Sequence, residues 1–422
     1  MALVGDGTTA AVDVTIVMPC LDEALSLPAC IANAKVALDA MARTFGLAGE
    51  ILIADNGSTD GSQDLARSLG ARVVPVRRRG YGAALIGGAG AARGRYIVMG
   101  DADGSYDFRE AVAMVGRLIE GADLCMGSRF KGEIKPGAMP WKNRHIGNPV
   151  LTGILNLLFT TGVSDAHCGL RAFTKDCFAR LRLTSTGMEF ASEMVIKAAL
   201  LGCRIAETPA SLSPDLRDRP PHLRPWRDGW RHLRYLLILS PSWVFAFPAA
   251  FAGALGLAIL VFASAMALFA PGLPTPIGNY WIVLAGALIG LGHTAGLLAA
   301  AGHLYGVREG YRPPSPRTAR LARFVSLETM LFGGLGLLIA GLAVLVAVAA
   351  WWSAHQFGAI ASVLPAVIGT SLVVVGAQNV LGGFLLAILG GNEAAFLREP
   401  EPDPQARPEA EIGYEVLHGL PR

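Results

Sequence analysis

The chain has 422 residues, which is too long for one ordinary domain. Hydrophobic residues make up 52% and charged residues 16% of it, and the mean hydropathy is +0.45. Because the charges lie mostly before residue 235, this composition argues against a chain that is soluble throughout. The formal net charge of +3 says little about partners, and we expect no nucleic acid among them.

Strands and helices alternate over the first hundred residues. Apolar runs predict strands at 14–18, 50–54, 72–76 and 95–99, with helices between them at 23–41, 62–69 and 83–93. Such alternation implies a parallel sheet with a site at the carboxyl ends of its strands. Three of those ends carry acidic or turn residues: Asp22 with Glu23, Asp55, and Asp101 with Asp103.

The segment Arg95–Gly104 is the most informative part of the sequence. The strand-like run Tyr96–Met99 is followed by two carboxylates, Asp101 and Asp103. Carboxylates at such a strand end are well placed to hold a hard divalent cation, which can bridge a diphosphate and help it leave. The alternative is a pair of solvated loop acids.

Other sites are argued against by the sequence. No GxxxxGK[ST] motif occurs, so P-loop chemistry is not expected. Gly88-Ala-Gly90 lies inside a predicted helix, with Arg93 where a dinucleotide fingerprint needs its third glycine, and close helix packing is the better interpretation. The six cysteines show no CxxC pair or Cys/His cluster that suggests zinc, and we expect them to be reduced.

The second half of the chain predicts a membrane domain. Each of four apolar stretches exceeds the roughly 20 residues that cross a bilayer: about 243–270, 279–306, 327–352 and 357–390. Only the connection after the second stretch is rich in arginine: Arg308, Arg312, Arg317, Arg320 and Arg323. Because positive loops stay cytoplasmic, we expect a multi-pass protein of the inner membrane with its N-terminal domain and both termini in the cytoplasm. The absence of an apolar signal sequence at the N-terminus agrees with this.

A basic, aromatic segment precedes the first span. After Pro225, a helix would place four apolar residues on one face and three arginines elsewhere: Trp226, Trp230, Leu233 and Leu237, against Arg227, Arg231 and Arg234. This composition is typical of a helix that lies in the membrane interface. The alternative is a basic stretch that serves only topology.

Four motifs occur in a fixed order: Pro19-Cys-Leu-Asp-Glu23, Asp55-Asn-Gly-Ser-Thr-Asp-Gly61, Arg79-Gly-Tyr-Gly-Ala-Ala84 and Asp101-Ala-Asp103. Asp-x-Asp alone is a weak signal, but the ordered set is specific. Over about residues 12–240 the chain resembles the family 2 glycosyltransferases, in particular the polyprenyl-phosphate sugar synthases of the dolichyl-phosphate mannose or glucose type. The resemblance implies an α/β glycosyltransferase A-type domain, Rossmann-like with a mainly parallel sheet, followed here by an α-helical transmembrane domain with four spans.

The resemblance also implies the donor site. A nucleotide diphosphate sugar would contact Pro19, Asp22, Glu23, Asp55, Arg79, Gly82, Asp101 and Ala102, and Mg²⁺ or Mn²⁺ would bind Asp101 and Asp103. The family usually has Asn where Asp22 stands, which exchanges an amide for a carboxylate. A tight turn that caps the next helix is the alternative for Asp55–Gly61, and both can hold.

For the acceptor, the resemblance implies a phosphate site made of Arg129, Arg144 and Asn148. Asn148 stands where the family often has Ser. Alone, either arginine would be a surface salt bridge more often than not. The sugar side would be lined by Asp165, Arg171 and Glu189, which join Asp103 and the two arginines as the residues expected to be catalytic. Glu193 could equally be a structural partner for an arginine.

These residues predict a reaction and a domain organisation. A phosphomonoester is already anionic at neutral pH, so it needs positioning more than a general base. We expect inverting, metal-dependent transfer of glucose or mannose from a UDP or GDP sugar to a polyprenyl phosphate, with a β-linked product. Another lipid acceptor such as a diacylglycerol, or a lipid flippase or scaffold with an inactive head, are the alternatives. Homo-oligomerisation is left open.

The expected parts of the chain are a catalytic domain (1–212), juxtamembrane helices (213–240), the spans (241–392) and a disordered cytoplasmic tail (393–422).

Overall fold

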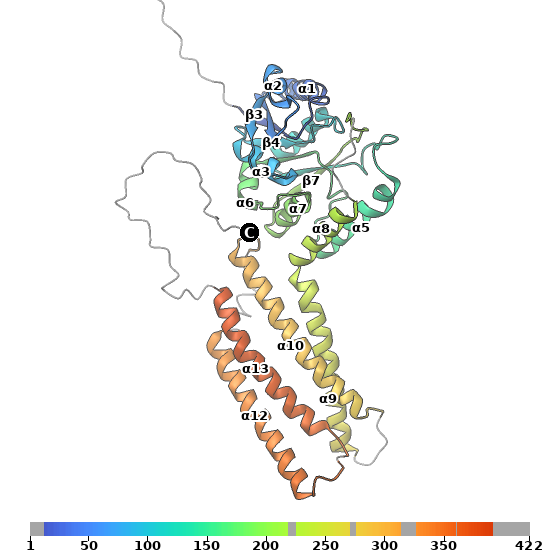
Figure 1. Cartoon of the computed structure of the whole chain (residues 1–422), viewed down its shortest axis with the longest axis vertical. Helices are drawn as coiled ribbons and strands as arrows, with labels where there is room; N and C mark the ends of the chain where they lie inside the picture. The colour runs from blue at the N-terminus through green and yellow to red at the C-terminus, as the bar shows by residue number, and fades with distance from the viewer. Residues whose placement is uncertain (1–11, 218–224, 271–275, 314–325, 360, 391–422) are drawn as a thin grey trace, which may run out of the picture.

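The computed structural model describes residues 12–217, 225–270, 276–313, 326–359 and 361–390. An α/β domain lies at one end of the molecule, and four long helices extend away from it (Figure 1). The predicted tail and the side chains of Arg317, Arg320 and Arg323 fall outside the described residues, so the structure does not bear on them.

The α/β domain is built on a seven-stranded sheet in the order β3-β2-β1-β4-β6-β5-β7. Its strands are β1 Val14–Cys20, β2 Gly49–Asp55, β3 Arg72–Pro75, β4 Tyr96–Met99, β5 Leu124–Ser128, β6 Arg171–Thr174 and β7 Ile205–Pro209. Strands β1 to β4 pair in parallel, as do β5 and β7, whereas β6 is antiparallel to both of its neighbours. The mainly parallel sheet is therefore confirmed, with β6 as the exception.

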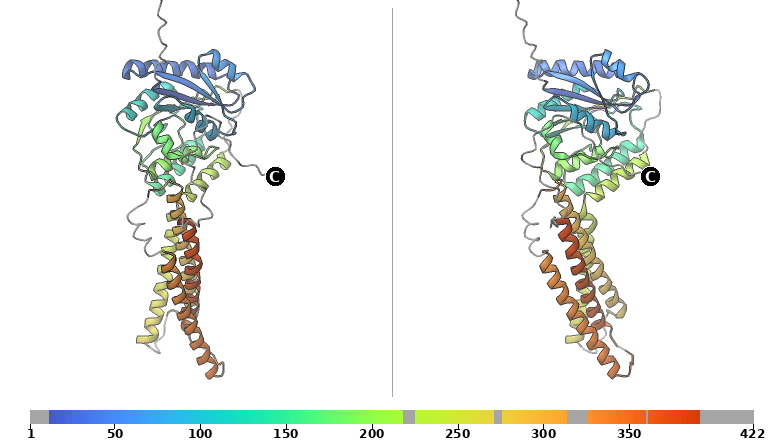
Figure 2. Two further views of the ribbon diagram at one scale, coloured as in Figure 1. Left: turned by 90° about the vertical axis from the view of Figure 1, so that its left-hand side faces the viewer. Right: turned by 60° about the vertical axis from the view of Figure 1, so that its left-hand side comes forward.

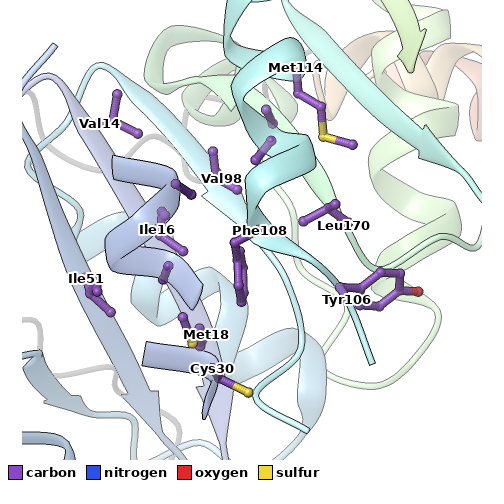
Figure 3. Close-up of a cluster of buried hydrophobic side chains, with 14 of the residues drawn as sticks. Val14, Ile16, Met18, Cys30, Ile51, Val98, Tyr106, Phe108, Met114 and Leu170 are labelled. Carbon is purple, nitrogen blue, oxygen red and sulfur yellow. The ribbon is translucent and has the colours of Figure 1, made fainter. Parts of the chain in front are cut away.

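Alternate residues of β1 point to opposite faces of the sheet, and each face has its own core. Ile16 and Met18 pack with Phe108 and Met114 on one face (Figure 3), whereas Val17 packs with Leu85 on the other. The helices of this domain are α1 Leu27–Phe45, α2 Ser62–Ser68, α3 Tyr81–Ala91, η1 Phe108–Glu110, α4 Ala111–Ile119, η2 Asn143–Gly147, α5 Asn148–Phe159, α6 Lys175–Leu181 and α7 Phe190–Leu200.

Two predicted details of these helices can be compared with the structure. Helix α1 begins at Leu27, four residues later than expected, since Glu23–Ser26 form a turn and a proline occupies the first turn of the helix. A Cβ atom on Gly88 of α3 would lie 2.5 Å from Val17 Cγ1, so the helix approaches the sheet as closely as glycine allows. The packing interpretation of this glycine is confirmed.

The remaining helices are α8 Pro225–Ile238, η3 Ser242–Ala246, α9 Phe247–Phe269, α10 Asn279–Arg308, α12 Leu327–Ala354 and α13 Leu364–Gly390. Four segments are long and apolar enough to cross a membrane: Ser242–Phe269, Asn279–Arg308, Leu327–Ala354 and Leu364–Gly390. The four predicted spans are thus confirmed. They pack side by side in the order α9, α10, α13, α12 (Figures 1 and 2).

Helix α8 joins the two parts of the molecule and has two kinds of face. His232 and Leu236 are buried against the α/β domain, where α8 packs on α5 and α7. Trp230 and Leu237 of the predicted apolar face are exposed. This arrangement leaves an aromatic and aliphatic surface on the last helix before the first span.

Candidate active site

The turns after β1 and β2 lie against each other at the carboxyl edge of the sheet. The Thr59 amide donates to Asp22 Oδ1 at 2.7 Å, and the Asp22 amide donates to Ser58 Oγ at 2.9 Å. Asp22 itself has a φ of +56°. An asparagine has the same Oδ1 acceptor, so the exchange of Asn for Asp at this position preserves the contact between the two turns.

Asp55 is buried at the end of β2 and is held by its own turn. Its carboxylate accepts from the Gly57 amide at 3.0 Å and from Gln63 Nε2 at 2.7 Å. Its neighbour Asn56 donates to the Arg78 carbonyl and accepts from the Gly80 amide. Asp55–Gly61 therefore forms the expected turn, although its last residue, Gly61, has no side chain to cap α2. Asn56 joins this turn to the basic turn Arg77–Gly82.

Two further expected donor residues lie around that basic turn. Arg79 is exposed, and a Cβ atom on Gly57 would lie 3.9 Å from its Nη2 atom. A Cβ atom on Gly82 would meet the carbonyl oxygens of Ser185 and Gly187, so a glycine is needed there for the close approach of the two segments. Pro19, at the end of β1, is half-buried beside Ala54 of β2.

Asp101 and Asp103 follow β4 at the same edge of the sheet. Asp101 Oδ1 accepts from the Tyr81 hydroxyl at 2.9 Å, and Asp103 Oδ1 accepts from Ser105 Oγ at 2.6 Å. Between them, the Ala102 carbonyl accepts from Ser26 Oγ at 2.6 Å, which fixes the loop to the start of α1. Burial, and next the charge of Asp103, raise the pKa of Asp101 to about 7.

The donor set fits a hard divalent cation. The charge of Asp103 raises the pKa of Asp101, and a cation bound between the two carboxylates would relieve this repulsion. Among the described residues, no group of three His, Cys, Asp or Glu side chains lies close enough to hold a metal. Diphosphate oxygens and water would therefore have to complete the coordination, as Mg²⁺ prefers.

Arg217 occupies the same region and was not predicted as a site residue. Its Nη1 atom lies 3.2 Å from Asp103 Oδ2, and its Nη2 atom lies 2.8 Å from Glu23 Oε1. The Leu216 amide also donates to the Asp103 carbonyl at 2.9 Å. The segment before α8 thus lies along the Asp101–Asp103 loop and places the Arg217 guanidinium beside the carboxylates of Glu23 and Asp103.

Arg129 and Asp165 form a buried pair, and the charge of Arg129 also acts on Asp101. Arg129 Nε and Nη2 donate to the two Asp165 carboxylate oxygens at 2.6 and 2.8 Å. Burial alone would raise the pKa of Asp165, but the hydrogen bonds and charge of Arg129 hold it below its ordinary value. Since a guanidinium has five N–H donors, three remain for another ligand.

In the part of the chain that the structure describes, Arg144 and Asn148 make no hydrogen bond with Arg129 or Asp165. Arg144 is exposed in η2 and has no ion-pair partner among the described residues. Asn148 is half-buried at the start of α5, and its Nδ2 atom contacts Met139 Sδ at 3.5 Å. Both therefore remain expectations as phosphate ligands.

Arg171 and Glu193 each have several partners within the chain. Arg171 is fully buried and donates to the carbonyl oxygens of Cys168, Ala166 and Ala191, so it ties the segment after Asp165 to α7 rather than facing an open site. The partner of Glu193 is Lys197 at 2.7 Å rather than an arginine.

Glu189 differs from these two residues. It immediately precedes α7, and its Oε2 atom is buried with no hydrogen-bond partner among the described residues. A buried carboxylate oxygen without a donor is costly, so this atom is available to a hydroxyl group of a ligand.

Comparison with known proteins places the chain in a family. Residues 15–182 match the family described as glycosyl transferase family 2, and residues 300–390 match the glycosyltransferase family 2 C-terminal transmembrane region. The low-salt glycan biosynthesis hexosyltransferase Agl6 of Haloferax volcanii is 37% identical over 391 residues, which cover 89% of each chain. The chain is a family 2 glycosyltransferase.

Two further proteins are similar to parts of this transferase. The dolichyl-phosphate hexose transferase of Haloferax volcanii is 31% identical over 163 residues, which cover 38% of this chain and 68% of the relative. Among solved structures, a glucosyl-3-phosphoglycerate synthase from Mycobacterium tuberculosis, in complex with Mn²⁺, UDP and glucosyl-3-phosphoglycerate, is 22% identical with a TM-score of 0.40, and the match covers 54% of this chain and 78% of that one.

Sequence reasoning on this glycosyltransferase missed Arg217 and the pairing of Arg129 with Asp165. Arg217 belongs to no motif and lies in the segment 213–240, which the sequence predicts to be juxtamembrane. The resemblance implies a role for Arg129 with the acceptor phosphate and for Asp165 beside the sugar, but nothing in their spacing indicates that the two side chains neutralise each other. Contacts of this kind depend on the tertiary fold.

Proposed function

We propose that this transferase moves one hexose, glucose or mannose, from a nucleotide diphosphate sugar to a polyprenyl phosphate with inversion. The product is a β-linked polyprenyl phosphohexose, made at the cytoplasmic face of the inner membrane. The observation that carries the proposal is the proximity of two opposite charges: the carboxylates of Asp101 and Asp103, and the guanidinium of Arg129, which is close enough to act electrostatically on Asp101.

The donor half of the site has groups for each part of a nucleotide diphosphate sugar. The joined turns at Asp22 and Asp55 form the wall on which base and ribose would rest. Asp101 and Asp103 would hold Mg²⁺ or Mn²⁺, which supplies charge neutralisation to the departing diphosphate when bound. Arg217, which lies beside Asp103, can turn its guanidinium to the same phosphates, because its fork geometry matches phosphate oxygens.

The acceptor half relies on positioning and charge. Arg129 has donors to spare after binding Asp165, and the buried Asp165 holds the guanidinium in one orientation. Arg144 would add a second cation from η2. A dianionic phosphate attracted by these groups needs no base to attack the sugar, so no catalytic histidine is required.

The membrane part of the chain supports a lipid acceptor. Four candidate spans follow α8, whose exposed residues include Trp230 and Leu237. Aromatic and aliphatic side chains on such a helix favour the headgroup region, where the phosphate of a polyprenyl lipid lies. A relative named dolichyl-phosphate hexose transferase adds support for a polyprenyl phosphate. The arginine-rich connection after α10 supports a catalytic domain on the cytoplasmic side.

A panel of donors and acceptors tests the proposal. Purified full-length protein is supplied with Mn²⁺ or Mg²⁺, each of UDP-glucose and GDP-mannose, and either undecaprenyl phosphate or a diacylglycerol. We expect one donor to label the polyprenyl phosphate. Label in the diacylglycerol alone would show a different lipid glycosyltransferase, and label in neither lipid from any donor would favour the flippase or scaffold alternative.

A further inference from the structure

Two histidines from distant segments meet at one serine on α7. Ser192 Oγ lies 2.8 Å from His232 Nδ1 and 3.3 Å from His167 Nε2. The two imidazole rings form an edge-to-face contact with their centroids 4.7 Å apart. Ser192 is fully buried and His232 is nearly so. No motif of the family resemblance contains His232, and the proposed chemistry uses neither ring.

The protonation of this cluster follows from its geometry. Burial, and next the electrostatic effect of the neighbouring His232, lower the pKa of His167 well below its ordinary value, so this ring is neutral. His167 Nδ1 is buried with no hydrogen-bond partner among the described residues. An orphaned N–H is rarer than an orphaned acceptor, so the His167 proton is best placed on Nε2. His167 then donates to Ser192, and Ser192 donates to His232 Nδ1.

One end of this cluster leads to the proposed acceptor site. The His167 amide lies 3.3 Å from Asp165 Oδ1, the same oxygen that accepts from Arg129 Nη2 at 2.8 Å. The neighbouring Ala191 carbonyl accepts from the buried Arg171. The segment that carries Asp165 is therefore fastened to α7 at two neighbouring residues, Ala191 and Ser192.

The other end leads to the membrane. His232 belongs to α8, which is followed closely by the first candidate span, Ser242–Phe269. Arg312, just after the second candidate span, donates to the Leu239 carbonyl at 2.6 Å and so holds the end of α8. Figure 1 shows α8 between the α/β domain and these helices. Helix α8 is thus fixed to the spans at one end and to the Asp165 segment through His232.

We infer that His232 is a positioning residue, which acts through Ser192 and His167 to set the Asp165–Arg129 pair at a fixed place relative to the membrane-entry helix. The inference rests on the proposed function for the identity of the ligand, a lipid phosphate that cannot leave the headgroup region. A guanidinium held at a constant depth relative to the membrane is already positioned for the lipid phosphate, which lowers the entropic cost of binding.

Kinetics of matched variants test this role. His232→Leu removes the hydrogen bond to Ser192, whereas His232→Asn keeps a polar atom at the place of Nδ1. For protein in lipid nanodiscs, we expect His232→Leu to raise the KM for undecaprenyl phosphate about 10-fold, since a buried hydrogen bond contributes that much. The KM for the nucleotide sugar should not change, and His232→Asn should restore the acceptor KM to within about 2-fold of the wild type.

Leu236→Ala is the packing control, because Leu236 is fully buried one turn later on the same face of α8. It should lower the midpoint of thermal unfolding without the rise in acceptor KM. An unchanged acceptor KM in His232→Leu would show that His232 serves only packing. The same conclusion would follow if His232→Asn and Leu236→Ala raised the acceptor KM as much as His232→Leu.

A second measurement does not depend on the reaction. Phe130 follows Arg129 and is 37% exposed, and all six cysteines are buried. A Phe130→Cys reporter should react several-fold faster with a thiol reagent when combined with His232→Leu, and at an unchanged rate with His232→Asn. Equal labelling rates in all three backgrounds would overturn the inference. This holds whether or not the wild type transfers hexose, because a lack of transfer to any lipid counts only against the proposed function.

Discussion

Arg217 Nη1 lies 3.2 Å from Asp103 Oδ2, so a cation of the chain itself already faces the second carboxylate of the proposed metal site. The same guanidinium also pairs with Glu23. Any metal ion that binds Asp103 must share it with this arginine or displace it. The free enzyme and the donor complex would then differ in where Arg217 places its charge.

Removing Arg217 should change metal binding before any substrate is present. Without the competing guanidinium, Arg217→Ala should bind Mn²⁺ about 5-fold more tightly, equivalent to about 1 kcal/mol. Titration calorimetry of the nucleotide-free protein measures this. Arg109→Ala is the control, because Arg109 pairs with Asp107 outside the site. Unchanged or weaker Mn²⁺ binding in Arg217→Ala would show that the arginine does not compete.

The Asp101 carboxylate should be needed for transfer. Asp101→Asn keeps an acceptor for the Tyr81 hydroxyl but removes the charge that a divalent cation requires, so the rate of hexose transfer should fall by about 100-fold or more. A radiochemical transfer assay over a range of Mn²⁺ concentrations measures the loss. Asp107→Asn, which changes a carboxylate near the same loop but outside the site, should retain transfer. Equal losses in both variants would indicate a folding defect instead.

Asp165 should contribute strongly to stability, because it neutralises the buried guanidinium of Arg129. Asp165→Ala leaves that charge without a partner and should destabilise the catalytic domain by about 3–5 kcal/mol. Thermal unfolding in detergent measures the shift. Asp64→Ala breaks an exposed pair with Arg67 and should leave the midpoint unchanged. A small shift in Asp165→Ala would show that water or another group solvates Arg129.

The Asp165 contribution also has a predictable pH dependence. The folded-state pKa of Asp165 lies below its ordinary value, so its stabilisation is present above the unfolded pKa of about 4 and is lost as the pH falls through the folded value. The difference in unfolding midpoint between the wild type and Asp165→Asn should therefore be constant at neutral pH and shrink in acid. A difference that grows in acid would contradict the ion pair.

The exposed Arg144 should act on the acceptor alone. Arg144→Ala should raise the KM for undecaprenyl phosphate by about 10-fold, because hydrogen bonds to a charged group are worth about 1.5–3 kcal/mol. Steady-state kinetics with each substrate varied in turn separate this effect from donor binding. Lys142→Ala removes a neighbouring exposed cation from the same segment and is the control. If both variants raised the acceptor KM alike, the effect would be general surface charge.

The two ends of α10 test the proposed orientation. Tyr280 at its start and Glu309 just after its end are both exposed. In intact cells, a membrane-impermeant maleimide should label Tyr280→Cys and not Glu309→Cys, because the arginine-rich connection after α10 stays inside. Labelling of Glu309→Cys alone would show the opposite topology.

The sequence predicted the parts of the fold that depend on local pattern. Apolar runs placed β1 to β4 and the first three spans within a few residues, whereas the fourth helix begins at Leu364, seven residues later than predicted. The acidic turns pointed to one edge of the sheet. The antiparallel strand β6 was not predicted, because its four residues, Arg171–Thr174, give no periodic signal and its direction is set by its pairing with β4 and β5.

In the candidate site too, the sequence predicted the residues that a local pattern marks and missed those that tertiary contacts bring in. Asp101 and Asp103 were found from the residues that follow a strand, and their placement is as expected. Arg217, Asn56 and His232 contribute through contacts with residues far along the chain, which no local pattern reveals. The resemblance implies that Arg171 lies beside the sugar, and its contacts with three carbonyl oxygens could not be predicted from the sequence.

The most direct test of the proposed reaction is the structure of its product. Wild-type protein in nanodiscs is incubated with undecaprenyl phosphate, Mn²⁺ and the donor found active in the panel, and the extracted lipid is analysed by mass spectrometry and NMR. We predict a lipid heavier by one hexosyl group, attached to the phosphate as the β anomer, and none from Asp101→Asn. An unmodified lipid phosphate, or a hexose attached to any other lipid, would contradict the account.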